Sequence, residues 1–247
     1  MTYSDKVTAY NKLVLDVKNC HMLSDCNKFG NVKLTKCDIC NEINLWTYWQ
    51  GGVESLNAKI LLVGQDWGCV SENIEQPLYY IIQKEHYPNK HYMDKNNNVT
   101  DKHLCDLFKR IGYDIRNDTL QDLFFTNFVL CYREEGLSGG FKQRWANNCS
   151  EYFKRLVKII QPKIIICLGR SVYYSVMRAF EQKAFSCKYN DIIEKGEQTI
   201  YIDDFAVQVF PMAHCGVMGT NNRNKGAKYN DVLDLQKKDW EALKKYL

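Results

Sequence analysis

A short polar loop follows a continuous apolar run in the first third of the sequence. The segment spans residues 58–63, with its apolar residues at 58 and 60–63, and the loop reads Gly64-Gln65-Asp66-Trp67-Gly68. An apolar run of this length predicts a central strand that is covered on both faces. Polar groups just past the carboxyl end of a buried parallel strand lie where open α/β sheets bind ligands. The loop therefore predicts either a ligand-binding edge or a plain strand-to-loop turn capped by Asp66.

Cysteines are the second group of residues that suggest chemistry. The sequence has eleven, and its N-terminus lacks the apolar core of a signal peptide, which predicts a cytoplasmic protein with reduced thiols. Cys37-Asp38-Ile39-Cys40 has the spacing by which two thiolates bind one metal centre from a tight turn. Two sites remain open. One is a local zinc site made of Cys20, Cys26, Cys37 and Cys40, and the other joins Cys37 and Cys40 to distant cysteines.

Two further polar groups interrupt or follow apolar segments. Thr126 and Asn127 lie inside the apolar run 123–131, and His214 follows an extended segment at 206–210. A buried Asn amide must be satisfied, so Asn127 is either a structural residue or a group that binds a ligand. His214 taken alone has the features of an ordinary loop histidine.

The elements that must position these residues alternate between strands and helices. Apolar runs predict strands at 58–63, 123–131, 163–168 and 206–210, with a further extended segment at 199–202. Amphipathic patterns predict helices at 4–20, 101–113, 144–160, 171–181 and 229–246. This alternation predicts an α/β fold, a three-layer αβα arrangement with a central, mainly parallel four-stranded sheet. We expect one domain over 1–247, with 1–36 as a helical, cysteine-containing N-terminal extension.

The bulk composition sets broad limits on function. The formal net charge of +4 permits nucleic-acid binding without arguing for it. No apolar run reaches the length of a transmembrane helix, so no membrane partner is expected. The hydrophobic content of 45% and charged content of 25% are ordinary for a soluble globular protein, which we expect to be a monomer.

Several of these segments together resemble the uracil-DNA glycosylase superfamily, most closely its iron–sulfur (family 4-like) branch. The resemblance covers residues 37–223 and depends on the order and spacing of motifs that are not specific one by one. These are Cys37-x-x-Cys40, the 64–68 loop, Pro77, Thr126-Asn127-x-x-x-Cys131, Cys149, the segment 161–169 and His214.

The resemblance implies an enzyme that flips a nucleotide out of double- or single-stranded DNA and hydrolyses the N-glycosidic bond of uracil or a modified pyrimidine. It assigns Asp66 to the water and the cationic sugar, and His214 to the oxygen of the departing base. It also implies a [4Fe-4S] cluster, with zinc as the alternative metal, on Cys37, Cys40, Cys131 and Cys149.

The remaining roles concern the base and the DNA. The resemblance implies a base pocket made of Gln65, Asn127, Trp67, Gly68, Leu78 and Tyr79. It implies that Met218 enters the minor groove where the flipped base was. The basic residues Arg223, Lys225 and Lys228 follow Met218 and are expected to contact phosphates.

The sequence departs from the family pattern around the base. Trp67 replaces a proline, and Gly68 stands where the classical enzymes have the tyrosine that blocks thymine, as in the iron–sulfur branch. Leu78 replaces the stacking phenylalanine, so Trp67, Tyr79 or Tyr80 would have to stack. These changes predict room for a base bulkier than uracil. The alternatives are therefore a glycosylase for hypermodified phage DNA in antiviral defence, or a catalytically silent DNA-binding relative.

Overall fold

The computed structural model describes residues 1–28, 34–35, 52–66, 99–115, 120–133, 140–225 and 231–247. All statements below concern these residues. Seven of the predicted site residues lie outside them, namely Cys37, Cys40, Trp67, Gly68, Leu78, Tyr79 and Lys228.

The centre of the fold is a mostly parallel β-sheet, which confirms the predicted α/β class. Its order is β3-β2-β5-β7-β6, and the first four of these strands run parallel. The described sheet has five strands instead of the predicted four, because β6 pairs antiparallel with β7. A tight turn at Asp203, whose φ is +50°, reverses the chain so that β7 runs back beside β6. The strands are β2 (Ile60–Gly64), β3 (Leu123–Asn127), β5 (Ile164–Leu168), β6 (Gln198–Ile202) and β7 (Phe205–Met212).

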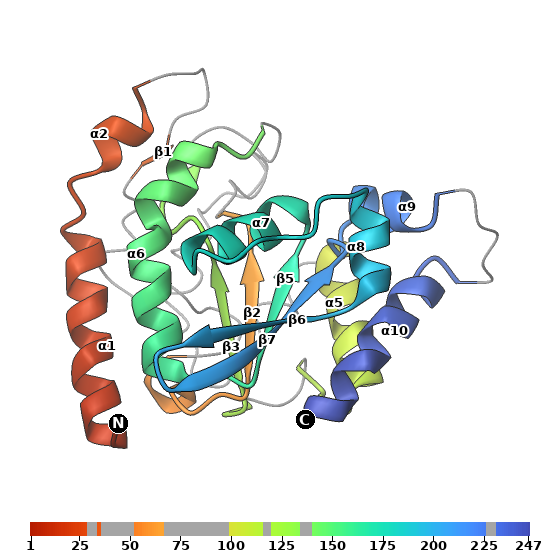
Figure 1. Ribbon diagram of the computed structural model, residues 1–247, viewed down its shortest axis with the longest axis horizontal. Coiled ribbons are helices and arrows are strands. Elements are labelled where there is room, and N and C mark those ends of the chain that lie inside the picture. The colour runs from red at the N-terminus through yellow and green to blue at the C-terminus, as the bar shows by residue number, and fades with distance from the viewer. Residues whose placement is uncertain (29–33, 36–51, 67–98, 116–119, 134–139, 226–230) are drawn as a thin grey trace, which may run out of the picture.

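Two apolar layers cover the sheet, which explains why the central strands are apolar throughout. Leu61 and Val63 of β2 point into one layer, and Ile60 and Leu62 point into the other. Figure 1 shows α1 beside α6 on one side of the molecule and α5 beside α10 on the other. The first layer contains α1 (Tyr3–Lys18), α6 (Gln143–Ile160) and α7 (Arg170–Ala179), and the second contains α5 (Val99–Arg110) and α10 (Asp234–Glu241).

Shorter elements complete the described fold. The predicted helix at 229–246 is α10 followed by a 3-10 turn, and the predicted strand at 123–131 ends already at Asn127. The short elements are α2 (Leu23–Cys26), β1 (Leu34–Thr35), η1 (Val53–Ser55), β4 (Tyr132–Arg133), α8 (Tyr189–Lys195), α9 (Val217–Arg223) and η3 (Ala242–Tyr246).

The N-terminal helix α1 is part of the core. Tyr10 and Leu13 are buried in the same layer as α6. The buried ammonium of Lys6 donates hydrogen bonds to the carbonyl oxygens of Leu56, at 3.1 Å, and Ile160, at 2.9 Å. These bonds satisfy a charge that burial disfavours, and burial accordingly lowers the pKa of Lys6. None of the described helices is long and apolar enough to cross a membrane.

Candidate active site

The predicted base-reading residue and the predicted catalytic loop meet at one edge of the sheet. Gly64 ends β2 and Asn127 ends β3, and these two residues are partners in the parallel register. The backbone N–H groups of Phe128 and Val129 then donate to the carbonyl oxygens of Gly64 and Gln65. The chain leaving β2 is therefore held beside the chain leaving β3, at the edge where open α/β sheets bind ligands.

Gly64 matters because it leaves space for the amide of Asn127. A Cβ atom added to Gly64 would lie 2.2 Å from Oδ1 of Asn127, closer than atoms can approach. A side chain at residue 64 would therefore displace the Asn127 amide from its present position. Sequence reasoning did not identify this role, because a glycine after an apolar strand equally fits an ordinary turn.

Asp66 and His214 lie just after the carboxyl ends of β2 and β7, and the charge of Asp66 acts on the imidazole of His214. Gln65 Nε2 donates to Asp66 Oδ2 at 3.3 Å, which orients the carboxylate. Protein packed around the imidazole lowers the pKa of His214, and the nearby negative charge of Asp66 partly opposes this shift. By its solvent-accessible surface, His214 is nevertheless an exposed residue. The two predicted catalytic residues therefore lie at the same end of the sheet, where the carboxylate charge of Asp66 acts on the imidazole.

The loop that carries His214 determines which ring nitrogen holds the proton of the neutral imidazole. The backbone N–H of Gly216 donates to Nδ1 of His214 at 3.0 Å, and an N–H group can only donate. Nδ1 must therefore accept, which places the proton of the neutral imidazole on Nε2. Since its pKa is lowered, His214 remains neutral at physiological pH and offers an Nε2–H donor.

Residues from two other helices hold the His214 loop in place. Gln236 of α10 is buried, and its Nε2 donates to the carbonyl oxygens of Ala213, at 3.2 Å, and His214, at 3.4 Å. His103 of α5 uses Nδ1 to donate to the carbonyl oxygen of Cys215 at 2.7 Å. Both are positioning residues that the sequence did not reveal, because a Gln or His in a helix more often faces solvent.

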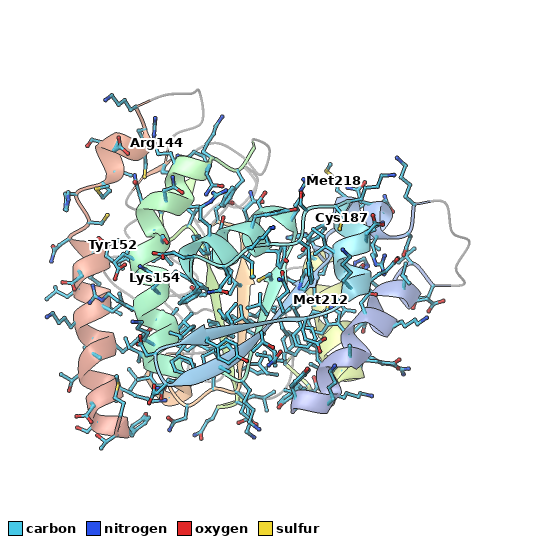
Figure 2. The ribbon with its side chains drawn as sticks, in the orientation of Figure 1. Arg144, Tyr152, Lys154, Cys187, Met212 and Met218 are labelled. Carbon is cyan, nitrogen blue, oxygen red and sulfur yellow. The ribbon has the colours of Figure 1, made fainter. Side chains whose placement is uncertain are left out.

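The segment after His214 forms the short helix α9. Gly219 within it is tightly enclosed, since an added Cβ would lie 2.1 Å from the carbonyl oxygen of His214. Met218 is 79% exposed and lies at the edge of the molecule (Figure 2). Lys225 is also exposed. Their predicted contacts with DNA thus involve side chains that are accessible.

Arg223 has a different role from the predicted one. Its side chain is buried, and Nε and Nη2 donate to the two carboxylate oxygens of Asp239 at 2.7 and 2.8 Å. Nη1 donates to Glu194 at 3.0 Å. The guanidinium therefore joins α9 to α10 and α8 and is not available to a phosphate, so the prediction of a DNA contact at Arg223 is wrong.

The two predicted metal ligands that the structure describes lie on the α6 side of the sheet. Cys149 is buried in α6, and its thiol accepts a hydrogen bond from the backbone of Leu130. Cys131 is half-buried and packs against the same layer. Burial raises the pKa of Cys149 to about 12, so this thiol is neutral unless a positive charge is bound beside it. Thiol donors of this kind suit both iron–sulfur clusters and zinc.

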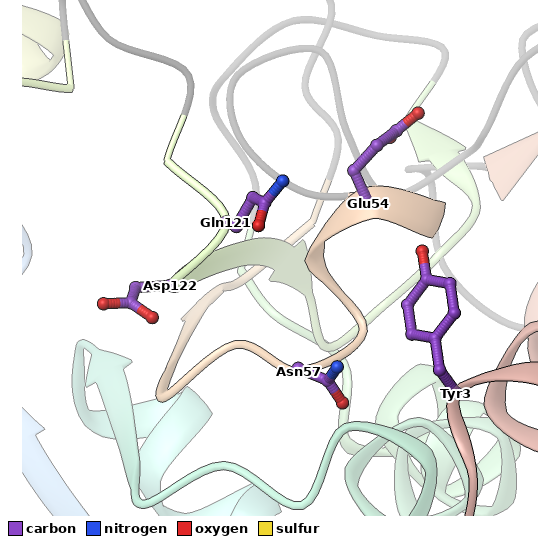
Figure 3. Close-up of a pocket in the computed structure, with 5 residues that line it drawn as sticks. All are labelled: Tyr3, Glu54, Asn57, Gln121 and Asp122. Carbon is purple, nitrogen blue, oxygen red and sulfur yellow. The ribbon is translucent and has the colours of Figure 1, made fainter.

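A polar hollow lies at the opposite end of the sheet, where the parallel strands β2 and β3 begin. Figure 3 shows its lining, and its volume is about 280 Å³. It lies at the amino ends of β2 and β3, because Asn57 precedes β2 and Gln121 precedes β3. Asp122, which also lines it, is paired with Lys59 at 3.0 Å. The hollow is therefore remote from Asp66 and His214 and is separate from the candidate active site.

Comparison with known proteins identifies one family. The model of the uracil DNA glycosylase superfamily matches residues 52–243. The matched range contains Asp66, Asn127, His214 and Met218, and it leaves α1 and α2 outside. No curated protein matches the sequence.

Proposed function

The chain belongs to the uracil-DNA glycosylase superfamily, and on this basis we propose that it hydrolyses the N-glycosidic bond of uracil or a modified pyrimidine in DNA. The observation that carries this proposal is that Asp66, Asn127 and His214 lie at the carboxyl ends of three parallel strands, β2, β3 and β7, of one sheet. This arrangement provides a carboxylate, a neutral donor and an amide, the groups that base release requires.

Bond cleavage separates charge: Asp66 stabilises the positive charge on the sugar, and His214 stabilises the negative charge on the base. The bond between the sugar carbon and the base nitrogen breaks, and its electron pair leaves with the base. The carboxylate of Asp66 stabilises the positive sugar and orients a water molecule, which adds to the sugar carbon as its proton passes to the carboxylate. The Nε2–H of His214 donates to the base oxygen on which negative charge develops.

Asn127 and Gln65 recognise the base in this proposal. A side-chain amide both donates and accepts, so Asn127 matches the edge of a pyrimidine that presents a carbonyl beside an N–H. Gly68, in place of a blocking tyrosine, favours acceptance of a base substituted at its 5-position. A second candidate function, a glycosylase for hypermodified phage DNA, follows from the same substitution.

A panel of DNA substrates tests the proposal. Duplexes and single strands carrying uracil, mismatched thymine or 5-substituted cytosine are incubated with the protein, and abasic sites are cleaved with alkali. Strand cleavage at uracil or at a substituted pyrimidine is the expected result. Release of bases only from hypermodified phage DNA, followed by mass spectrometry, would support the second candidate. Binding without release from any substrate would identify a catalytically silent relative.

We also propose that the protein holds a metal cofactor, a [4Fe-4S] cluster in preference to zinc. Cys131 and Cys149 supply two of its thiolates. When bound, the cluster would tie α6 to the chain after β3 and would supply the positive charge that buried thiolates need. In this proposal bond cleavage uses Asp66, His214 and Asn127, so no catalytic step passes through the cluster.

Substitution of Gly64 by Ala is expected to reduce kcat/KM for base release by about 10²-fold, because the new methyl group displaces the Asn127 amide. Single-turnover excision and thermal unfolding would measure the two effects separately. Gly140→Ala is the matched control, since a Cβ there would meet no atom within 4 Å. An unchanged rate for Gly64→Ala would show that the position of Asn127 is unimportant.

Substitution of Met218 by Ala is expected to slow excision from duplex DNA on the order of tenfold and to leave single-stranded DNA unaffected. The exposed thioether side chain would fill the space left by the flipped nucleotide, which only a stacked duplex requires. Excision rates on both forms measure this. Val217→Ala, also at an exposed residue of α9, is the control. Equal slowing on both forms would remove Met218 from the flipping step.

A further inference from the structure

One side chain of α8 donates to the last backbone carbonyl groups of α9. Asn190 Nδ2 lies 3.1 Å from the carbonyl oxygen of Asn222 and 3.4 Å from that of Arg223, the last two residues of this helix. The final carbonyl groups of a helix have no partner within the helix, so a donor from elsewhere has to satisfy them. We propose that Asn190 is a positioning residue for base flipping, because it holds α9 in the orientation in which Met218 faces the duplex. This inference rests on the proposed function and goes beyond the residues at the sheet edge.

The sequence of α9 does not stabilise a helix without such support. The helix has seven residues, and isolated helices of this length are unstable in water. Its N-cap, Gly216, forms no side-chain capping bond, and no acidic residue lies in its first turn. Gly219 lies inside the helix, and glycine is a poor helix former. The orientation of α9 therefore depends on contacts with the rest of the protein.

The helix that supplies the Asn190 amide is attached to the sheet beside the candidate active site. Asn190 follows Tyr189, whose hydroxyl donates to the carbonyl oxygen of Met212 at 3.0 Å. Met212 ends β7 and lies two residues before His214. Figure 1 shows α8 beside α9, on the side of the molecule away from α1. The donor that α8 presents to α9 is therefore fixed relative to the sheet edge at which His214 lies.

The two ends of α9 make different contacts. Met218 lies in the first turn and is strongly exposed. Gly219 contacts the loop behind it, since an added Cβ would lie 2.1 Å from the carbonyl oxygen of His214. A side chain that enters a stacked duplex is pushed back toward the protein, and the helix that carries it has to resist this force. The contact at Gly219 and the bonds from Asn190 together hold α9 near both of its ends.

Asn190 differs from Arg223, which also joins α8 to α9. The guanidinium of Arg223 is buried against the carboxylate of Asp239, so its loss is expected to destabilise the whole fold. Asn190 is uncharged and half-buried, and its bond to Asn222 is exposed to solvent. Water can therefore replace the lost amide as a donor. Substitution of Asn190 is expected to alter the orientation of α9 with little loss of overall stability.

The experiment measures single-turnover excision from duplex and single-stranded DNA by Asn190→Ala. Excision from duplex DNA is expected to slow on the order of tenfold, as for Met218→Ala, while excision from single strands and the melting temperature change little. Asn190→Asp is expected to slow duplex excision at least as much, because a carboxylate cannot donate and repels the carbonyl oxygens. Asn11→Ala and Asn11→Asp, at an exposed residue of α1, are the controls. Equal slowing on both forms of DNA, or an unchanged duplex rate, would overturn the proposal.

A double substitution shows whether Asn190 acts through Met218. If it does, Asn190→Ala combined with Met218→Ala slows duplex excision no more than Met218→Ala alone, whereas losses that multiply would contradict the proposal.

Flipping is also measured without base release, by the fluorescence of 2-aminopurine placed beside the target pyrimidine, which rises when its neighbour leaves the stack. A smaller rise with Asn190→Ala than with the unmodified protein supports the proposal, and an equal rise contradicts it. This readout holds for a protein that flips a base and releases none, so failure of the glycosylase assignment is distinguishable from failure of this inference.

Discussion

Replacement of Asp66 by Asn is expected to slow base release by about 10²–10³-fold while DNA affinity changes little. The carboxylate acts on a sugar that becomes positive only in the transition state, so its loss affects the chemical step more than binding. Asn keeps the size of Asp66 and its contact with Gln65, which limits structural change. Single-turnover excision and fluorescence anisotropy with the same duplex measure the rate and the affinity.

The control variant is Asp106→Asn, which removes one negative charge from the exposed side of α5. It is expected to leave the rate of base release unchanged. The assignment of Asp66 fails if its variant loses DNA binding while turnover per bound complex stays the same. The two variants together separate a local effect of the carboxylate from a change in net charge.

The largest expected loss of stability follows substitution of Arg223 by Met. Burial raises the pKa of Asp239, and the paired guanidinium of Arg223 opposes that rise. Without Arg223, a nearly buried carboxylate lacks its partner, which costs about 3–5 kcal/mol of unfolding free energy. For a chain of this length the melting temperature is expected to fall by roughly 10 °C, measured by calorimetry.

Lys225, an exposed residue two positions after Arg223, provides the control substitution. Lys225→Met is expected to leave the melting temperature nearly unchanged and to flatten the salt dependence of DNA binding. Arg223→Met with Asp239→Leu is expected to recover part of the lost stability, because neither charge is then left unpaired. A weaker salt dependence for Arg223→Met at a normal melting temperature would restore the original prediction of a phosphate contact.

The sequence was sufficient to predict the sheet and the edge at which the site lies. Strands covered on both faces must be apolar throughout, and β2 and β5 are the two clearest such runs. Parallel strands place their carboxyl ends together, and the register of β2 and β3 pairs Gly64, two residues before Asp66, with Asn127. The antiparallel strand β6 was recognised as extended but not counted in the sheet, because pairing is a tertiary property.

The contacts that position His214 could not be predicted in this way. Gln236 and His103 are polar residues on helices, and a polar residue gives the same local pattern whether it faces water or a buried carbonyl. The role of Arg223 could not be predicted for the same reason. A basic residue near other basic residues has the pattern of a solvated surface, and only the folded structure shows that Arg223 is buried. In both cases the partners are far apart in the sequence, and only the packed helices bring them together.

The bond from Gln236 to the His214 loop also bears on how the protein is made. Synthesis proceeds from the N-terminus, and α10 follows every strand of the described sheet. The sheet can pair before α10 leaves the ribosome, but the carbonyl groups of Ala213 and His214 then lack the amide that holds them. A nascent chain stalled before residue 234 would thus carry all its candidate catalytic side chains while its His214 loop had the bond from His103 but not those from Gln236. The bonds that Gln236 makes to this loop therefore form only after all the strands of the described sheet have been synthesised.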